Sequence, residues 1–226
     1  MAAEQKSALW IVTGAASGIG AAVVSRARRA GANVLALDID EEKGVALARE
    51  SGAIFRRCDI SNLSQWQALI QYLATLEAEF GTPTNIHLNA GIQVAPPHEP
   101  LAEYQLEAVT LERYRRMMGV NVDGVVFGLQ SLLPLLSSGS AIVVTASLAG
   151  VTPYSVDPLY AMSKHAVVGL VRSLAPELSK RGVNIHALCP GAVDTAIIPL
   201  AQKTAGASFM SPEMLAQDVF ELMQEN

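Results

Sequence analysis

The sequence is poor in cysteine, histidine and aromatic residues, and each shortage excludes a class of protein. Its 226 residues include two cysteines, four histidines and 5% aromatics. Cys58 and Cys189 both lie in strand-like runs, which favours buried reduced thiols over a disulfide. The histidines show none of the spacings typical of metal ligands, so we expect no metal site.

Basic residues and long apolar runs are also scarce. The chain has 16 Lys and Arg against 21 Asp and Glu, a net charge of −5, which argues against nucleic acid as a partner. Residues 1–6 do not read as a signal peptide, and no apolar run reaches the ~18 residues of a membrane span. We therefore expect a cytoplasmic protein without membrane contact. Its length suits one α/β domain over residues 1–226, with the core at 8–195.

A glycine-rich turn follows the first apolar run. Residues 9–13 read as a strand buried on both faces, and Gly14, Gly18 and Gly20 lead into a predicted helix at 18–30. Gly14 permits a tight turn, while Gly18 and Gly20 let a ligand's phosphates and the strand approach the backbone. The free N–H groups and positive dipole end of the helix suit a pyrophosphate. The alternative is an ordinary strand-to-helix turn.

An acidic residue ends the second predicted strand. Asp38 lies 18 residues after Gly20, near the ~20 expected of a carboxylate that binds the hydroxyls of an adenosine ribose. A carboxylate there repels a 2′-phosphate, and positions 15–17 and 39 hold no Arg or Lys to receive one. The pattern therefore favours NAD over NADP. The alternative role for Asp38 is a helix N-cap, which Asp40 fills better.

Strand and helix patterns alternate along the chain. This alternation predicts a doubly wound parallel sheet with helices on both faces, a Rossmann-type α/β fold. Ligands of such folds gather at the carboxyl ends of the strands, where we expect Asp38, Asp59, Asn89, Ser147 and Pro190. The six predicted strands are 9–13, 33–38, 53–60, 84–88, 141–145 and 183–188. The predicted helices are 18–30, 41–50, 61–80 with Ser61 as its cap, 109–136, 157–180, and one opened by Ser211 and Pro212.

Six motifs occur in a fixed order. They are Thr13-Gly14-x3-Gly18-x-Gly20, Asn89-Ala90-Gly91, Asn121, Ser147, Tyr160-x3-Lys164 and Pro190-Gly191. Together they resemble the short-chain dehydrogenase/reductase family, in its shorter single-domain form, over roughly residues 8–223. The resemblance implies an oxidoreductase that transfers a hydride between a secondary alcohol or ketone and NAD. It also implies a homodimer or homotetramer.

Tyr160 is the candidate general acid/base. Oxidising an alcohol needs a base within hydrogen-bond reach of the hydroxyl, and a free Tyr has a pKa of about 10. Lys164 lies one helical turn further on the same face, where a cation ~4 Å away lowers that pKa by up to about three units. By the resemblance, Lys164 also binds the nicotinamide ribose, Ser147 steadies the substrate oxygen and Asn121 holds a water for proton relay. The alternatives are a snorkelling Lys on an ordinary helix face and a structural hydrogen bond for Asn121.

The resemblance implies a wider set of residues in contact with NAD. Those of the glycine turn and the second strand are Gly14, Ser17, Gly18, Ile19, Gly20, Asp38 and Ile39. Those beside the adenine and in the turn that supports the sheet are Asp59, Ile60, Asn89, Ala90 and Gly91. Those at the nicotinamide and pyrophosphate are Tyr160, Lys164, Pro190, Gly191, Val193 and Thr195. Residues 196–210 read as a mobile substrate lid.

Two other functions use related folds. A non-catalytic dinucleotide-binding or sensing protein is one alternative, although the intact Ser147, Tyr160 and Lys164 argue against it. A sugar-nucleotide epimerase or dehydratase is the other, but it would have a longer chain and the glycine spacing G-x-x-G-x-x-G. Family members usually add a seventh strand, which is missing here. We therefore expect residues 183–188 to form a sheet edge that lacks the usual protecting Lys or Pro.

Overall fold

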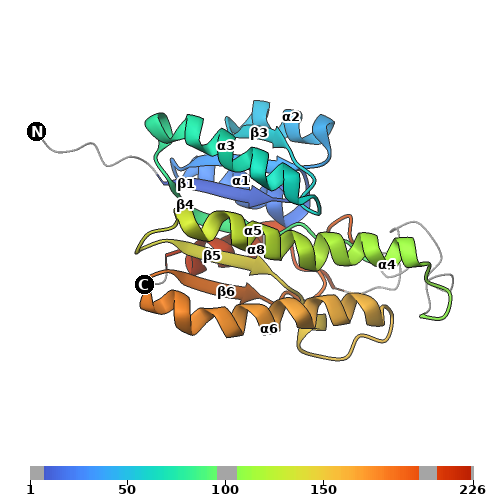
Figure 1. Ribbon diagram of the computed structural model, residues 1–226. Helices are drawn as coiled ribbons and strands as arrows, with labels where there is room; N and C mark the ends of the chain where they lie inside the picture. The colour runs from blue at the N-terminus through green and yellow to red at the C-terminus, as the bar shows by residue number, and fades with distance from the viewer. Residues whose placement is uncertain (1–7, 96–105, 199–207, 225–226) are drawn as a thin grey trace, which may run out of the picture.

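A six-stranded parallel sheet forms the middle layer of the molecule (Figure 1). The computed structural model describes residues 8–95, 106–198 and 208–224. The strand order is β3-β2-β1-β4-β5-β6, so the chain winds outward from β1 in one direction and from β4 in the other. This reversal confirms the predicted doubly wound fold. The strands are β1 Leu9–Thr13, β2 Asn33–Asp38, β3 Ile54–Arg57, β4 Pro83–Leu88, β5 Ala141–Thr145 and β6 Asn184–Leu188.

Helices cover both faces of the sheet. Leu9 and Ile11 of β1 pack into an apolar cluster with side chains of α3, α5 and α6. Trp10 and Val12 point the other way, into a cluster with side chains of α1 and α8. The two cores explain why the strand is apolar without interruption. The α-helices are α1 Gly18–Arg29, α2 Glu41–Ser51, α3 Leu63–Phe80, α4 Leu111–Met118, α5 Gly124–Leu132, α6 Pro158–Lys180 and α8 Pro212–Leu222.

Most helix ends follow the chemistry of their residues. Asp40 caps α2 by accepting from the Lys43 N–H at 3.1 Å, and Ser211 caps α8. The predicted Ser61 cap of α3 is wrong. The cap is Asn62, whose Oδ1 accepts from the Ser64 N–H at 3.0 Å. Ser61 is occupied elsewhere, since its hydroxyl donates to Asp59 Oδ1 at 2.7 Å.

The long helix predicted at 109–136 is not continuous. It begins at Leu111 after the Thr110 cap, and a π-helical turn at Gly119–Asp123 separates α4 from α5. A 3₁₀ turn, Leu133–Leu135, ends it. The apolar spacing runs through the π turn without a break, so periodicity alone could not reveal it. Such single π turns are frequent at functional sites, and Asn121 lies in this one.

One stretch of the described chain, Leu111–Leu135, is long and apolar enough to cross a membrane by length and composition. In this fold its inner side chains Met117, Leu129 and Leu132 are buried. They pack in the interior next to α3 and α6. A core helix passes the same test of length and composition, and we interpret this stretch as one.

β6 is the last strand of the sheet in the part of the chain that the structure describes. Its five residues pair with β5 from Asn184 opposite Ala141 to Leu188 opposite Thr145. Only Ile185 of the strand is fully buried, and the other four residues are partly exposed. The predicted edge position is confirmed within this sheet.

Candidate functional site

The glycine turn between β1 and α1 packs tightly against the turn that follows β4. Gly14 has φ +61, and a Cβ there would lie 2.7 Å from the Ala90 Cα. A Cβ on Gly20 would overlap the Gly14 carbonyl oxygen. Asn89 completes the contact, since its Nδ2 donates to the Thr13 and Gly14 carbonyls at 3.2 Å each. The turn expected at Gly14 and the close approach of the strand expected at Gly20 are therefore present, and only glycine fits at these two positions.

No side chain caps the N-terminus of α1. Ser17 makes no capping hydrogen bond, and the first turn of α1 contains no acidic residue. In contrast, side chains cap α2, α3, α4, α6 and α8. Gly18 lies beside Thr195, whose methyl carbon would be 2.9 Å from a Cβ at that position. The exposed N–H groups and positive helix end are the features that suit a pyrophosphate.

Asp38 stands at the carboxyl end of β2, next to the glycine turn. Its Oδ2 accepts from the Ala16 N–H at 2.8 Å, and its Oδ1 accepts from the Asp40 N–H at 3.0 Å. These bonds fix the carboxylate at the edge of the sheet and leave further lone pairs on both oxygens. Asp40 and not Asp38 caps α2, so the capping alternative for Asp38 is excluded. Ile39 is exposed.

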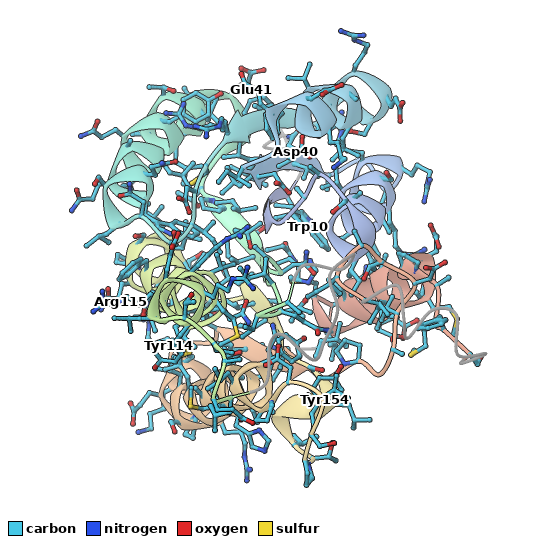
Figure 2. All side chains as sticks on the ribbon, turned by 90° about the vertical axis from the view of Figure 1, so that its right-hand side faces the viewer. Trp10, Asp40, Glu41, Tyr114, Arg115 and Tyr154 are labelled. Atoms are coloured by element: carbon cyan, nitrogen blue, oxygen red, sulfur yellow. The ribbon has the colours of Figure 1, made fainter. Side chains whose placement is uncertain are left out.

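Tyr160, Ser147 and Lys164 come together beyond the carboxyl end of β5. Ser147 opens the short 3₁₀ turn η4, Leu148–Gly150, and its hydroxyl hydrogen-bonds to the phenol of Tyr160. Lys164 lies one turn further along α6, with Nζ 5.7 Å from the centre of the Tyr160 ring. Figure 2 views the molecule from the right-hand side of Figure 1, with Tyr154 labelled at the lower right and Asp40 near the top.

Burial dominates the ionisation of both groups. Burial raises the pKa of Tyr160 to about 12; the Ser147 hydrogen bond opposes this, while Tyr154 and Asp157 add to it. Burial lowers the pKa of Lys164 to about 8, and the nearby Cys189 thiol opposes that shift. The expected lowering of the Tyr160 pKa by Lys164 is not found. The ammonium instead donates to the Thr145 carbonyl at 2.8 Å, and the phenol is protonated at neutral pH.

Asn121 is buried and holds the loop that follows β4. Its Oδ1 accepts from the Ile92 N–H at 2.8 Å, and its Nδ2 donates to the Ile92 carbonyl at 2.9 Å. The Nδ2 also donates to Ser163 Oγ at 3.0 Å, and Ser163 in turn donates to the Tyr160 carbonyl at 2.7 Å. The structural role left open for Asn121 is therefore present. It connects the loop to α6.

The remaining predicted residues lie along the same edge of the sheet. Asp59 follows β3 and accepts from the Ser61 N–H at 3.0 Å. Ile60 packs against Gly124. Pro190 follows β6, and its carbonyl accepts from the Leu148 N–H at 2.8 Å. Gly191, Val193 and Thr195 continue that segment. Val193 forms a parallel β-bridge with Met210. Most of the predicted lid, positions 199–207, lies outside the described residues.

Tyr160 belongs to a small apolar cluster. Its buried members are Val94, Ala95, Met117, Ala149, Tyr160 and Ala161. Tyr154 packs edge-on against Tyr160 with ring centres 6.1 Å apart. Sequence reasoning missed the supporting residues Thr145, Asp157 and Ser163. Two of them gave a usable signal: Ser163 lies three residues after Tyr160 on the same helix, and Asp157 stands before Pro158 in the same pattern of cap and proline as Ser211 and Pro212.

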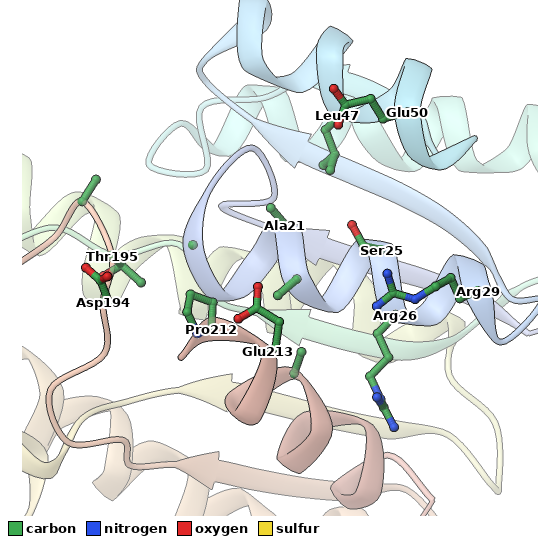
Figure 3. A pocket seen from close by; sticks show the side chains of 14 residues that line it. Ala21, Ser25, Arg26, Arg29, Leu47, Glu50, Asp194, Thr195, Pro212 and Glu213 are labelled. Carbon is green, nitrogen blue, oxygen red and sulfur yellow. The ribbon is translucent and has the colours of Figure 1, made fainter. Parts of the chain in front are cut away.

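A groove of about 690 Å³ runs along the outer side of α1, between the end of α2 and the start of α8 (Figure 3). Gly18 and Thr195 form one end of it, and Arg26, Arg29 and Glu213 line its length. None of Ser147, Tyr160 and Lys164 lines this groove. The groove therefore borders the start of α1 but does not reach the cluster of Ser147, Tyr160 and Lys164. Among the described residues no group of three or more His, Cys, Asp or Glu side chains could hold a metal ion.

Comparisons with known proteins agree with this geometry. A family model described as short chain dehydrogenase matches residues 8–205. A 2,5-dichloro-2,5-cyclohexadiene-1,4-diol dehydrogenase from Sphingobium indicum is 39% identical over 196 residues, 84% of this chain and 74% of that protein. A 3beta-hydroxysteroid dehydrogenase from Mediterraneibacter gnavus is 32% identical over 87% of this chain and 69% of that protein. A 3-ketoacyl-(acyl-carrier-protein) reductase from Brucella melitensis, solved with NADH, has a TM-score of 0.83 at 27% identity and covers 96% of this chain and 91% of its own.

Proposed function

The chain belongs to the short-chain dehydrogenase/reductase family, and we propose that it is an NAD-dependent oxidoreductase acting on a secondary alcohol or the corresponding ketone. The observation that carries the proposal is the meeting of Ser147, Tyr160 and Lys164 at the carboxyl ends of the strands, the same end of the sheet at which α1 begins. A phenol, a hydroxyl bonded to it and a buried ammonium stand at one point of the carboxyl edge. These are the groups that proton transfer to or from an alcohol oxygen needs.

The residues present fit NAD. The glycine turn leaves a cradle that a Cβ would fill, α1 offers uncapped N–H groups, and Asp38 offers carboxylate oxygens to a ribose. When bound, NAD supplies the hydride acceptor or, in its reduced form, the hydride donor. The relative solved with NADH supports the choice of a nicotinamide cofactor.

Tyr160 exchanges the proton. In ketone reduction its phenol donates a proton to the carbonyl oxygen as the hydride reaches the carbon, and Ser147 Oγ hydrogen-bonds to the same oxygen. In alcohol oxidation the proton moves the other way, to the Tyr160 phenolate. Because the pKa of Tyr160 is raised to about 12, the phenol is ready to donate at neutral pH, and oxidation gains rate as the pH rises. Lys164, whose pKa is lowered to about 8, carries its positive charge 5.7 Å from the centre of the Tyr160 ring at neutral pH.

The substrate we propose is a neutral alcohol or ketone, since the side chains around Tyr160 are apolar. The two relatives named above are dehydrogenases of a cyclic diol and of a hydroxysteroid. Secondary alcohols on a ring are therefore the first substrates to test. The test is NADH formation from such a panel, measured at neutral and at alkaline pH. Tight NAD binding without turnover of any member would favour a dinucleotide-sensing protein instead.

Asp38 is expected to make the protein prefer NAD over NADP by about 1–3 kcal/mol, the usual penalty for opposed polar groups. The Asp38→Asn variant removes the negative charge and should narrow the gap in Kd between NADH and NADPH. The matched control is Asp40→Asn, which neutralises an exposed carboxylate two residues away. Titration of both cofactors by fluorescence measures the effect. Tighter binding of NADPH by the unaltered protein would contradict the assignment and direct attention to Arg57, opposite Asp38 in the β2–β3 pairing.

We also expect the protein to form a homodimer or homotetramer through α4, α5 and α6. Two of these helices leave large apolar side chains exposed. Leu111 and Met162 are 59% and 43% exposed. Light scattering at micromolar concentration should give at least twice the mass of one chain. Leu111→Glu should shift the protein toward monomer, whereas Leu63→Glu, on the exposed start of α3, should not. A monodisperse monomer would contradict the prediction.

A further inference from the structure

Asp157 makes two hydrogen bonds, one to the first turn of its own helix and one to a loop 63 residues away in the sequence. It is 5% exposed and stands immediately before α6. Its Oδ1 accepts from the Tyr160 N–H at 2.8 Å, and its Oδ2 accepts from the Val94 N–H at 3.0 Å. One carboxylate therefore joins the first turn of the catalytic helix to the loop that follows β4.

That loop is held on both sides of Gln93. Asn121 binds the N–H and the carbonyl of Ile92, and Asp157 binds the N–H of Val94. Val94 then packs in the same apolar cluster as Tyr160. The backbone of this loop is thus part of the wall beside the phenol, and its position depends on the two anchors.

The choice of aspartate is informative. A helix cap needs one side-chain oxygen, and Thr110 and Ser211 provide one each for α4 and α8. A second N–H donor needs a second acceptor, and the two carboxylate oxygens are equivalent acceptors, whereas Asn has one oxygen and a donating NH₂. Burying a carboxylate is costly unless it is well hydrogen-bonded. The two-sided bond, and not the cap alone, accounts for aspartate at this position.

We propose that Asp157 is a positioning residue of the reaction, which clamps the substrate-side loop at Val94 to the helix that carries Tyr160. The proposal rests on the proposed function for its catalytic consequence, while the clamp itself is a structural claim. Loss of the hydrogen bond between Asp157 and Val94 would release the loop that follows β4 from α6. The glycine turn and Asp38 would keep their contacts.

The charge of Asp157 also acts on the phenol. The groups that face Tyr160 are the Ser147 hydroxyl from beyond β5, Tyr154 from the preceding loop, and Asp157 and Lys164 from α6. Cys189, at the end of β6, lies beside Lys164. Burial is the main cause of the raised pKa of Tyr160, and Asp157 adds to it. Neutralising Asp157 should therefore ease ionisation of the phenol.

The first experiment compares Asp157→Asn with the unaltered enzyme across a pH series. We expect KM for the alcohol to rise about tenfold, because the loop beside the substrate loses a hydrogen bond to a charged group that holds it in place. The alkaline limb of the oxidation profile should move to lower pH, and the Kd of NAD should stay within about twofold. Asp40→Asn, which neutralises another N-cap, is the control and should change none of these. An Asp157→Asn enzyme with unaltered KM and pH profile would overturn the positioning role.

The second experiment tests the hydrogen bond between Asp157 and Val94 by a measurement that does not depend on enzyme activity. Hydrogen exchange should show the Val94 amide protected in the unaltered protein and exchanging faster in Asp157→Asn, with the Ile92 amide still protected by Asn121. Equal Val94 protection in both proteins would overturn the clamp. If the unaltered protein turns over no substrate, the proposed function fails, and this measurement still decides the clamp.

Discussion

Tyr160→Phe is expected to lower kcat by ~10²-fold or more while NAD still binds with nearly unaltered affinity. Phenylalanine keeps the ring, its edge-on contact with Tyr154 and its place under Lys164. It removes only the hydroxyl that Ser147 hydrogen-bonds and that carries the transferable proton. Loss of a general acid/base typically costs 10²–10⁴-fold. Because the glycine turn, Asp38 and Lys164 are left unaltered, the change should appear in kcat and not in the Kd of NAD.

The control is Tyr72→Phe on α3, where the ring stacks under Arg56 with the guanidinium 4.5 Å from its centre. That variant loses a phenol hydroxyl far from the site and should keep full activity. The measurement is steady-state turnover in both directions, with NAD binding followed separately. If Tyr160→Phe turned over at the normal rate, the proposed role of Tyr160 would be abandoned. The fold and the family would stand.

The positions of the strands could be predicted because their residues are buried on both faces. β1, β2 and β5 occupy the ranges expected from their apolar runs. The errors arose where side chains compete locally. The Ser61 hydroxyl donates a hydrogen bond to Asp59, and Asn62 caps α3 instead. The π turn around Asn121 likewise left no trace in the apolar spacing.

The candidate site was predictable to the extent that it depends on strand ends and helix faces. Asp38, Asn89 and Ser147 follow strands of one parallel sheet, so their meeting at one edge follows from topology. Tyr160 and Lys164 share a helix face by their spacing. What spacing cannot supply is burial. The raised pKa of Tyr160 depends on side chains brought by other elements. The clamp made by Asp157 depends on Val94, 63 residues away.

A second large effect concerns stability in acid and depends on His87. This side chain is fully buried in the middle of β4, between Val12 and Val143 of the neighbouring strands. Its Nε2 lies 2.9 Å from Thr145 Oγ1, and Nδ1 has no hydrogen-bond partner among the described residues. Thr145 Oγ1 donates to Asn89 Oδ1 at 3.1 Å, so Nε2 carries the proton and donates to Thr145. Burial lowers the pKa of His87 from 6.5 to about 3.

We therefore expect the free energy of unfolding to fall as the pH drops from about 6.5 toward 3. In that window the unfolded chain binds a proton at His87 that the folded protein excludes, so acid favours unfolding. The difference of about 3.5 units corresponds to about 4–5 kcal/mol at most, a large part of the stability of an ordinary domain. His87→Val, which matches its two neighbours, should flatten this loss by several kcal/mol when denaturant midpoints are compared between about pH 7 and pH 4. His165→Gln, at an exposed position on α6, should keep the full acid dependence. Parallel acid curves for His87→Val and the unaltered protein would show that another group governs the acid limb.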